Sequence, residues 1–178
     1  FPTAVMVYTC VLSAMGKLNP ARAVAPSGMV TGAVSLGYGT GAGGCARVQY
    51  ELALTGLGGT SQHDGTPILT PINHFTAGSP IEIVESEYPV IMRRYEMWQD
   101  SAGAGRHRGG VGYVRELEVL EDCALTLRSA GHKHPAWGLA GGTGPATSKT
   151  VINAGGRSER RIGPIATTGL SAGDTLQV

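Results

Sequence analysis

The sequence predicts an α+β fold: a β-rich domain with a buried N-terminal helix, a short capped helix and glycine-rich connections between strands. Three observations lead to this prediction. Residues 1–16 carry no charged side chain, and glycine supplies 28 of the 178 residues. The second half of the chain contains several runs with the two-residue period of a half-buried strand. Because a chain of this length suffices for one domain, we expect residues 1–178 to form a single domain.

The first helix is expected over Pro2–Met15. Pro2 suits the first helical turn, and Gly16 followed by Pro20 is typical of a helix end. The segment is apolar on nearly all sides, which predicts that the helix is buried. It is too short for a comfortable membrane span. No basic segment precedes it, as a secretory signal would require.

The second helix is expected to begin near Pro80 and to end before Pro89. Ser79 is the expected N-cap, and Pro80 suits the first helical position. Glu82 stands three residues after Ser79 and would complete a capping box. We therefore assign Glu82 a role in helix capping.

Strands are expected on both sides of this second helix, because the β-branched and aromatic content is high and several runs alternate between apolar and polar residues. The expected strands are Ala33–Tyr38, Cys45–Leu54, Val90–Trp98, Tyr113–Leu120, Ala124–Ser129, Thr150–Asn153 and Thr175–Val178. Loops are expected at residues 56–64 and 132–145. The glycine-rich segment Asp100–Gly112 joins two of these strands.

The charge balance excludes some classes of partner. The formal net charge is +1, which gives no field for binding nucleic acid or an anionic membrane. Charged residues make up 15% of the chain, against about 25% in an average domain. We expect other protein to cover part of the surface. Cys10, Cys45 and Cys123 are far apart and show no CxxC spacing, which favours buried, reduced thiols in a cytosolic protein.

The histidines provide weak signals for a site. His63 beside Asp64 could support a metal or a proton transfer, but Asp64 followed by glycine is more typical of a turn. His74 and the pair His132 and His134 match no metal-ligand spacing. We therefore expect no metal site in this chain.

The segment Asp100–Gly112 permits two interpretations. Its successive backbone N–H groups, with Arg106 and Arg108, could bind an anion. The segment lacks the ending of a P-loop and the spacing of a dinucleotide-binding loop, so close packing against neighbouring chain is favoured. Ser101 is expected to be structural. No catalytic residue can be assigned, and the candidate substrate- or anion-binding residues are Asp64, Asp100, Arg106 and Arg108.

The run from residue 78 to residue 120 resembles the hydantoinase B/oxoprolinase family. Ser79–Pro89, Arg94-Tyr95 and Asp100–Glu116 follow that family's pattern T-P-I-E-x-x-E-x-x-Y-P, then Y, then D-S-G-G-A-G-x-x-R-G-G-x-G-x-x-R-E. Trp137–Gly142 also resembles its P-x-G-L-x-G-G segment. Ser79 and Ala102 depart from the pattern, where threonine and glycine are usual. The resemblance covers most of the chain and only the C-terminal half of family members, which are several hundred residues long.

This resemblance implies a part of the B-type subunit of a heteromeric, ATP-dependent enzyme that opens cyclic amides such as hydantoins, 5-oxoproline or lactams. Some relatives carboxylate ketones instead, which is one alternative; a non-catalytic scaffold or assembly module is another. ATP and Mg would be bound by an A-type partner subunit. A divalent metal would lie in the N-terminal half of the B-type subunit. No ligand of that metal can be transferred to this sequence.

Overall fold

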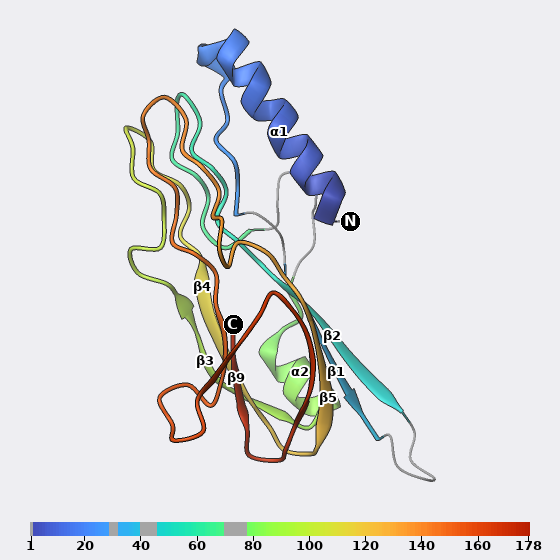
Figure 1. The fold of residues 1–178 in the computed structure, drawn as a ribbon. Helices are drawn as coiled ribbons and strands as arrows, with labels where there is room; N and C mark the ends of the chain where they lie inside the picture. Colours follow the sequence, from blue (N-terminus) through green and yellow to red (C-terminus); the bar gives the residue numbers. More distant parts are fainter. Residues whose placement is uncertain (1, 29–31, 40–45, 70–77) are drawn as a thin grey trace.

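The computed structural model describes residues 2–28, 32–39, 46–69 and 78–178. The fold is a strand-rich mixture of α and β structure, with two antiparallel sheets and two α-helices in these residues (Figure 1). The helices are α1 (Pro2–Leu18) and α2 (Ile81–Glu87), and a short 3-10 helix follows α1 at Pro20–Arg22. The predicted β-rich character is confirmed.

Nine strands form the two sheets. They are β1 (Gly32–Tyr38), β2 (Arg47–Ala53), β3 (Val90–Met97), β4 (Tyr113–Val119), β5 (Cys123–Arg128), β6 (Thr150–Ile152), β7 (Arg160–Ile162), β8 (Ile165–Leu170) and β9 (Thr175–Gln177) among the described residues. One sheet has the order β2-β1-β5-β8, and the other has the order β3-β4-β9-β6-β7. Every pairing between these strands is antiparallel.

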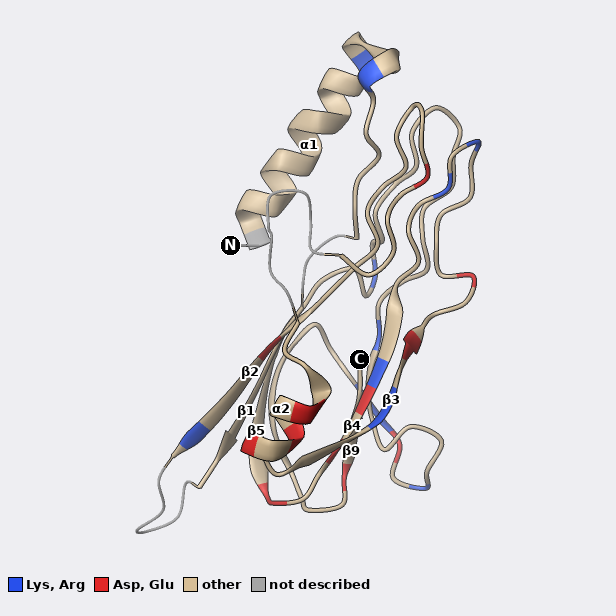
Figure 2. Ribbon diagram, turned by 180° about the vertical axis from the view of Figure 1, so that it is seen from behind, with Lys and Arg blue, Asp and Glu red and all other residues tan. Residues whose placement is uncertain are grey.

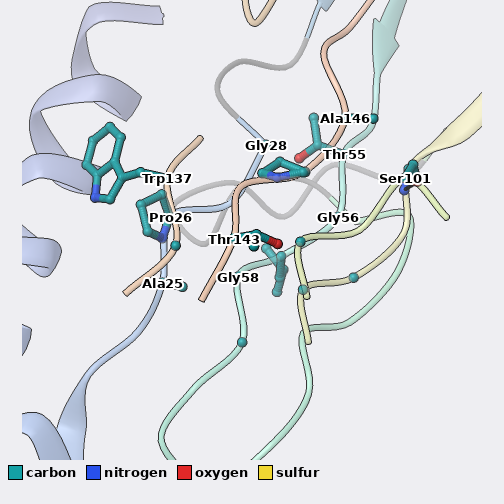
Figure 3. Close-up of a pocket in the computed structure, with 18 of the residues that line it drawn as sticks. Ala25, Pro26, Gly28, Thr55, Gly56, Gly58, Ser101, Trp137, Thr143 and Ala146 are labelled. Atoms are coloured by element: carbon teal, nitrogen blue, oxygen red, sulfur yellow. Dashed lines mark hydrogen bonds between the residues drawn. The ribbon is translucent and has the colours of Figure 1, made fainter. Parts of the chain in front are cut away.

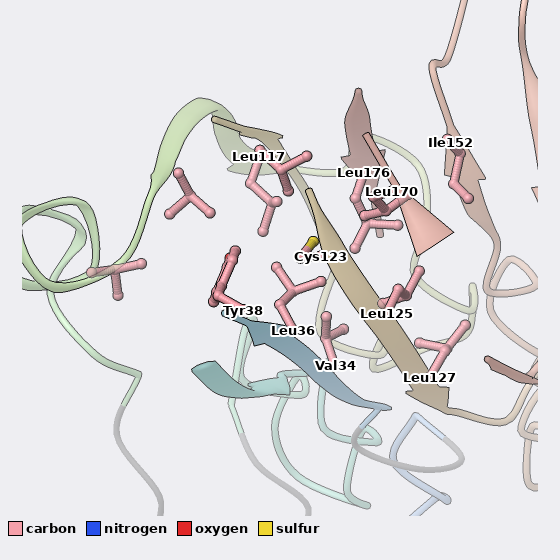
Figure 4. Packing of buried hydrophobic residues seen from close by; sticks show 13 residues of the cluster. Val34, Leu36, Tyr38, Leu117, Cys123, Leu125, Leu127, Ile152, Leu170 and Leu176 are labelled. Atoms are coloured by element: carbon pink, nitrogen blue, oxygen red, sulfur yellow. The ribbon is translucent and has the colours of Figure 1, made fainter. Parts of the chain in front are cut away.

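The hydrophobic core fills the space between the two sheets. Strand β1 alternates strictly between buried and partly buried residues, so that Val34, Leu36 and Tyr38 face inward. Figure 4 shows these side chains beside Leu125 and Leu127 of β5, with Leu117 and Leu176 of the other sheet nearby. The two-residue period of the sequence is therefore the origin of the packing.

Helix α1 forms where it was expected, but the prediction that it is buried is wrong. Val5, Thr9, Ser13 and Gly16 form a buried stripe along one face. The opposite face exposes large apolar side chains, among them Val7, Val11, Met15 and Leu18. The helix also continues through Gly16 to Leu18, and Gly16 lies in a close contact instead of ending the helix. A Cβ at Gly16 would stand 3.1 Å from the Cβ of Ala23.

Helix α2 confirms the predicted second helix but not its predicted cap. Pro80 occupies the N-cap position, and no side chain hydrogen bonds to that end of the helix. Ser79 and Glu82 therefore do not form a capping box. The fixed φ of proline starts the helix without one. The helix ends at Glu87, before Pro89, as predicted. Its residue Val84 is buried in the hydrophobic core.

Most predicted strands are confirmed with shifts of one or two residues, but β7 and β8 were missed. Strand β8 contains glycine and threonine and packs only lightly, so its pattern is weak in the sequence. It is held by a regular antiparallel register with β5. Cys123 is buried as predicted, whereas Cys10 is exposed on α1, so its predicted burial is wrong. Cys45 and His74 lie outside the described residues.

Candidate functional site

A large cavity lies among the long loops at the end of the sheets, close to the C-terminal end of α1 (Figure 3). Its volume is about 760 Å³, which is the size of a small-molecule site. Four stretches supply most of the lining: residues 16–28, 53–61, 98–114 and 129–149. Figure 3 labels Ala25, Pro26, Gly28, Thr55, Gly56, Gly58, Ser101, Trp137, Thr143 and Ala146 around it.

Glycines build the walls of this cavity by letting loops touch backbone to backbone. A Cβ on Gly56 would lie 1.9 Å from the carbonyl oxygen of Gly110, and one on Gly58 would lie 1.8 Å from that of Ala25. Gly103 approaches Thr143 in the same way, at 2.3 Å. No other residue fits at such distances. The packing interpretation of the glycine-rich segment is therefore confirmed at Gly103 and Gly110.

Backbone hydrogen bonds join these loops into one unit. Gly110 N donates to the carbonyl of Leu57 at 2.8 Å, and Gly28 N donates to that of Gly56 at 3.0 Å. Ser101 is a polar anchor of the same unit, because its hydroxyl donates to the Trp98 carbonyl and accepts from Gly112 N. The structural role predicted for Ser101 is confirmed.

The charged side chains of the cavity are all basic. Lys17, Arg106 and Lys149 are among the described lining residues, which include no aspartate or glutamate. Lys149 lies over the ring of Trp98, with Nζ 5.0 Å from the ring centroid. Few acidic residues lie on the long loops around the cavity, and most of the others lie on α2, on several strands and on the turns away from the cavity (Figure 2). This distribution favours a ligand with negative charge.

The structure brings Asp64 and Arg108 together, with His107 beside them. Asp64 accepts a hydrogen bond from the backbone N–H of Arg108 at 3.0 Å. Its carboxylate also lies 3.4 Å from Nε of Arg108 and 3.7 Å from Nδ1 of His107. Neither Asp64 nor Arg108 is among the described residues that line the cavity. The geometry therefore gives this pair a loop-to-loop contact.

The other two candidates lie apart from this pair. Arg106 is exposed and lines the cavity. Asp100 occupies an exposed turn with a positive φ of 57°, a conformation that aspartate adopts more readily than most residues. Of the four candidates, Arg106 alone is among the described lining residues. Binding of an anion there stays a prediction.

A serine and a histidine meet at the cavity wall. Ser129 Oγ lies 2.8 Å from Nε2 of His132, and both residues line the cavity. Burial lowers the pKa of His132 below its ordinary value, so its imidazole is neutral at neutral pH. Sequence reasoning considered His132 only as a metal ligand with His134. The S-x-x-H spacing at the end of a predicted strand was the available signal.

Buried polar groups hold the loops to the sheets beneath the cavity. Leu54 N donates to the hydroxyl of Tyr113 at 3.1 Å, and burial raises the pKa of that hydroxyl to about 12. Arg115 forms a 3.2 Å ion pair with Glu51, and both side chains are close to 90% buried. These contacts join β4 of one sheet to β2 of the other.

Among the described residues, no cluster of three or more His, Cys, Asp or Glu side chains is arranged to hold a metal ion. The described helices also include none that is long and apolar enough to span a bilayer.

Comparison with known proteins identifies the family. The family model described as Hydantoinase B/oxoprolinase matches residues 1–178. The chain belongs to this family. The fingerprint between residues 78 and 120 thus carries the hydantoinase B/oxoprolinase signature, and the resemblance is confirmed.

Several relatives in the hydantoinase B/oxoprolinase family have named activities. Caprolactamase subunit beta of Pseudomonas jessenii is 33% identical over 133 residues, covering 72% of this chain and 23% of that subunit. 5-Oxoprolinase 1 of Arabidopsis thaliana is 29% identical over 129 residues, covering 72% and 10%. Acetone carboxylase alpha subunit of Xanthobacter autotrophicus is 31% identical over 102 residues, covering 56% and 13%. The chain spans less than a quarter of each of these relatives.

Two solved structures share the fold. Nucleotide-free acetone carboxylase aligns with a TM-score of 0.80 at 18% identity, covering 97% of this chain and 28% of the other. ATP-dependent caprolactamase from Pseudomonas jessenii aligns with a TM-score of 0.75 at 24% identity, covering 92% and 30%. The chain therefore shares its overall fold with these two structures.

Proposed function

We propose that this chain is part of the B-type subunit of a heteromeric, ATP-dependent cyclic-amide hydrolase, and that its glycine-walled cavity contacts the substrate. The observation that carries the proposal is the basic cavity in a chain of this family. Three basic side chains, and no acidic one among the described residues, line a volume of about 760 Å³.

The chemistry of ring opening suits such a cavity. Water adds to the carbon of the phosphorylated amide, the C–N bond breaks, and the products are a carboxylate, an amine and inorganic phosphate. Negative charge develops on the carbonyl oxygen and remains on the carboxylate. Fixed positive groups and backbone donors stabilise that charge where water is excluded. Arg106 and Lys17 would act on the charge, and Lys149 over Trp98 would fix one end of the substrate.

The partner and cofactors belong to the same proposal. An A-type subunit would bind ATP with Mg and activate the amide by phosphorylation, and the remainder of the B-type subunit would hold a divalent metal. No step in this chain depends on that metal, because the described residues do not fit one. The complex would work in the cytoplasm.

A ketone carboxylase is the second candidate. It is favoured by the similarity to the acetone carboxylase alpha subunit, which is 31% identical to this chain over 102 residues. The hydrolase is preferred because caprolactamase subunit beta matches a larger share of the chain at higher identity. The basic cavity is compatible with both reactions, since each forms a carboxylate.

The test compares two arginines that stand two positions apart. The complete complex, with ATP and Mg, would be assayed for opening of ε-caprolactam, hydantoin and 5-oxoproline. Arg106→Ala removes a cavity charge, and we expect kcat/KM to fall about tenfold or more, the range for loss of a charged hydrogen bond. Arg108→Ala, which removes a charge paired with Asp64 outside the cavity, is the matched control and should keep the rate.

Three outcomes would contradict the proposal. Equal rates for the two variants would exclude a cavity role for Arg106. Bicarbonate-dependent consumption of a ketone, without ring opening, would identify the carboxylase instead. Full turnover by a complex that lacks this chain would reduce the chain to a scaffold or assembly module.

A further inference from the structure

Ser129 and His132 form a hydrogen-bonded pair that the proposed function does not use. Ser129 follows directly after β5, and His132 lies three residues further along the loop. Both side chains are half-buried and line the cavity. The Oγ–Nε2 distance of 2.8 Å is within the range in which a base removes a proton from a nucleophile.

The surrounding hydrogen bonds indicate which group holds the proton. Ser129 Oγ has a second acceptor in the carbonyl of Pro164, at 3.4 Å. That carbonyl already accepts the backbone N–H of Ser129 at 2.7 Å. The shorter contact to His132 is therefore the better acceptor for the hydroxyl proton. In this arrangement Nε2 of His132 accepts and Nδ1 carries the ring hydrogen.

The ionisation of His132 agrees with this assignment. Burial disfavours the imidazolium and lowers the pKa of His132, so Nε2 is available as an acceptor at neutral pH. The cavity of about 760 Å³ that Ser129 lines is large enough for a small acyl compound.

We propose that Ser129, with His132 as its general base, is a nucleophile that accepts an acyl group from a small ester or amide bound in the cavity. Ser129 Oγ bonds to the carbonyl carbon while its proton passes to Nε2 of His132. The bond to the alcohol or amine breaks, and that group leaves with the proton from Nε2. Water then releases the acid and restores Ser129, with His132 again relaying the proton.

This activity goes beyond the proposed function, because it requires neither ATP nor a partner subunit. The test therefore uses the 178-residue chain without ATP or a partner subunit. The chain would be incubated with diisopropyl fluorophosphate, which transfers its phosphoryl group to an activated serine and releases fluoride. Trypsin cuts after Arg128 and Lys133, so residues 129–133 form one peptide in which fragmentation locates the added mass.

We expect the added mass on Ser129 in the unmodified chain. His132→Gln retains a hydrogen-bonding side chain but cannot take the proton, so labelling should slow about a hundredfold or more. Ser148→Ala removes another serine hydroxyl from the same cavity and is the matched control, which should label at the normal rate. Hydrolysis of p-nitrophenyl acetate should follow the same order.

The absence of label on Ser129 in the folded chain would overturn the proposal, and so would equal labelling rates in the normal chain and His132→Gln. Both readouts use proteins that keep Ser129. The test therefore does not depend on a Ser129→Ala variant, which could fail to fold. A negative result would leave the ring-opening proposal standing, because that reaction is measured in the complex with ATP.

Discussion

At the scale of single residues, Asn153 and Asp174 illustrate how polar side chains close the second sheet. Asn153 has a positive φ of 53°, and its amide donates to Asp174 Oδ1 at 2.7 Å. The backbone N–H of Ser171 donates to Asp174 Oδ2 at 2.9 Å. These donors lower the pKa of Asp174 below its ordinary value, with the Asn153 amide as the largest cause.

Asp174→Asn tests this network through its pH dependence. The folded-state pKa of Asp174 is lowered, so its stabilisation is present above the ordinary carboxyl pKa of about 3.9 and is lost as the pH falls through the folded-state pKa. At pH 7 we expect the variant to lose about 1–2 kcal/mol in the free energy of unfolding. The difference between the two proteins should shrink as the pH falls below the ordinary carboxyl pKa and through the lowered pKa of Asp174.

Urea unfolding at several pH values would measure the difference. Asp100→Asn is the matched control, since Asp100 is exposed and asparagine also tolerates its positive φ. If the loss in the free energy of unfolding caused by Asp174→Asn stays constant from pH 7 to pH 3, the ionised carboxylate of Asp174 does not stabilise this network.

At the scale of elements, the glycine-rich loops distinguish this fold from a simple sandwich of two sheets. Gly56 packs against Gly110, and Gly103 packs against Thr143, each closely enough to exclude a Cβ. Each loop is held by backbone hydrogen bonds to the next one. The loops therefore act as rigid walls, and their rigidity depends on glycine.

Gly110→Ala tests that dependence. The new Cβ would stand 2.1 Å from the Thr66 carbonyl oxygen, a backbone atom that cannot turn aside. We expect a loss of about 2–3 kcal/mol in the free energy of unfolding, as for an overpacked core. Gly169→Ala, in β8 with no atom within 4 Å of the new Cβ, should change stability by less than about 0.5 kcal/mol. Equal effects in chemical denaturation would show that the close contacts do not matter.

The elements also show how far sequence reasoning extends. Strands such as β1 and β4 follow from alternation, because burial on one face imposes a period of two. The exposure of α1 could not be predicted, since an apolar helix gives no sign of whether its partner lies in the same chain. Arg106 was found from its place among glycines. The pairing of Ser129 with His132, and the basic side chains of Lys17 and Lys149, required the tertiary arrangement of distant loops.

At the scale of the whole molecule, two observations agree with a place in a larger assembly. The exposed face of α1 presents Val7, Val11 and Met15 to solvent in this chain. The chain also spans only 23% of caprolactamase subunit beta. The low content of charged residues, which predicted a covered surface, fits both observations.

The proposed function requires that the glycine-walled cavity contacts the substrate of an ATP-dependent hydrolase. Ala146→Trp would fill the cavity from a lining position, and Ala172→Trp would place the same side chain on an exposed turn that is not part of the described lining. The deciding measurement is ATP-dependent ring opening by complexes that contain each variant. If the cavity contacts the substrate, kcat/KM should fall at least about tenfold for Ala146→Trp and should not fall for Ala172→Trp. An assembled Ala146→Trp complex with an unchanged rate would contradict this contact.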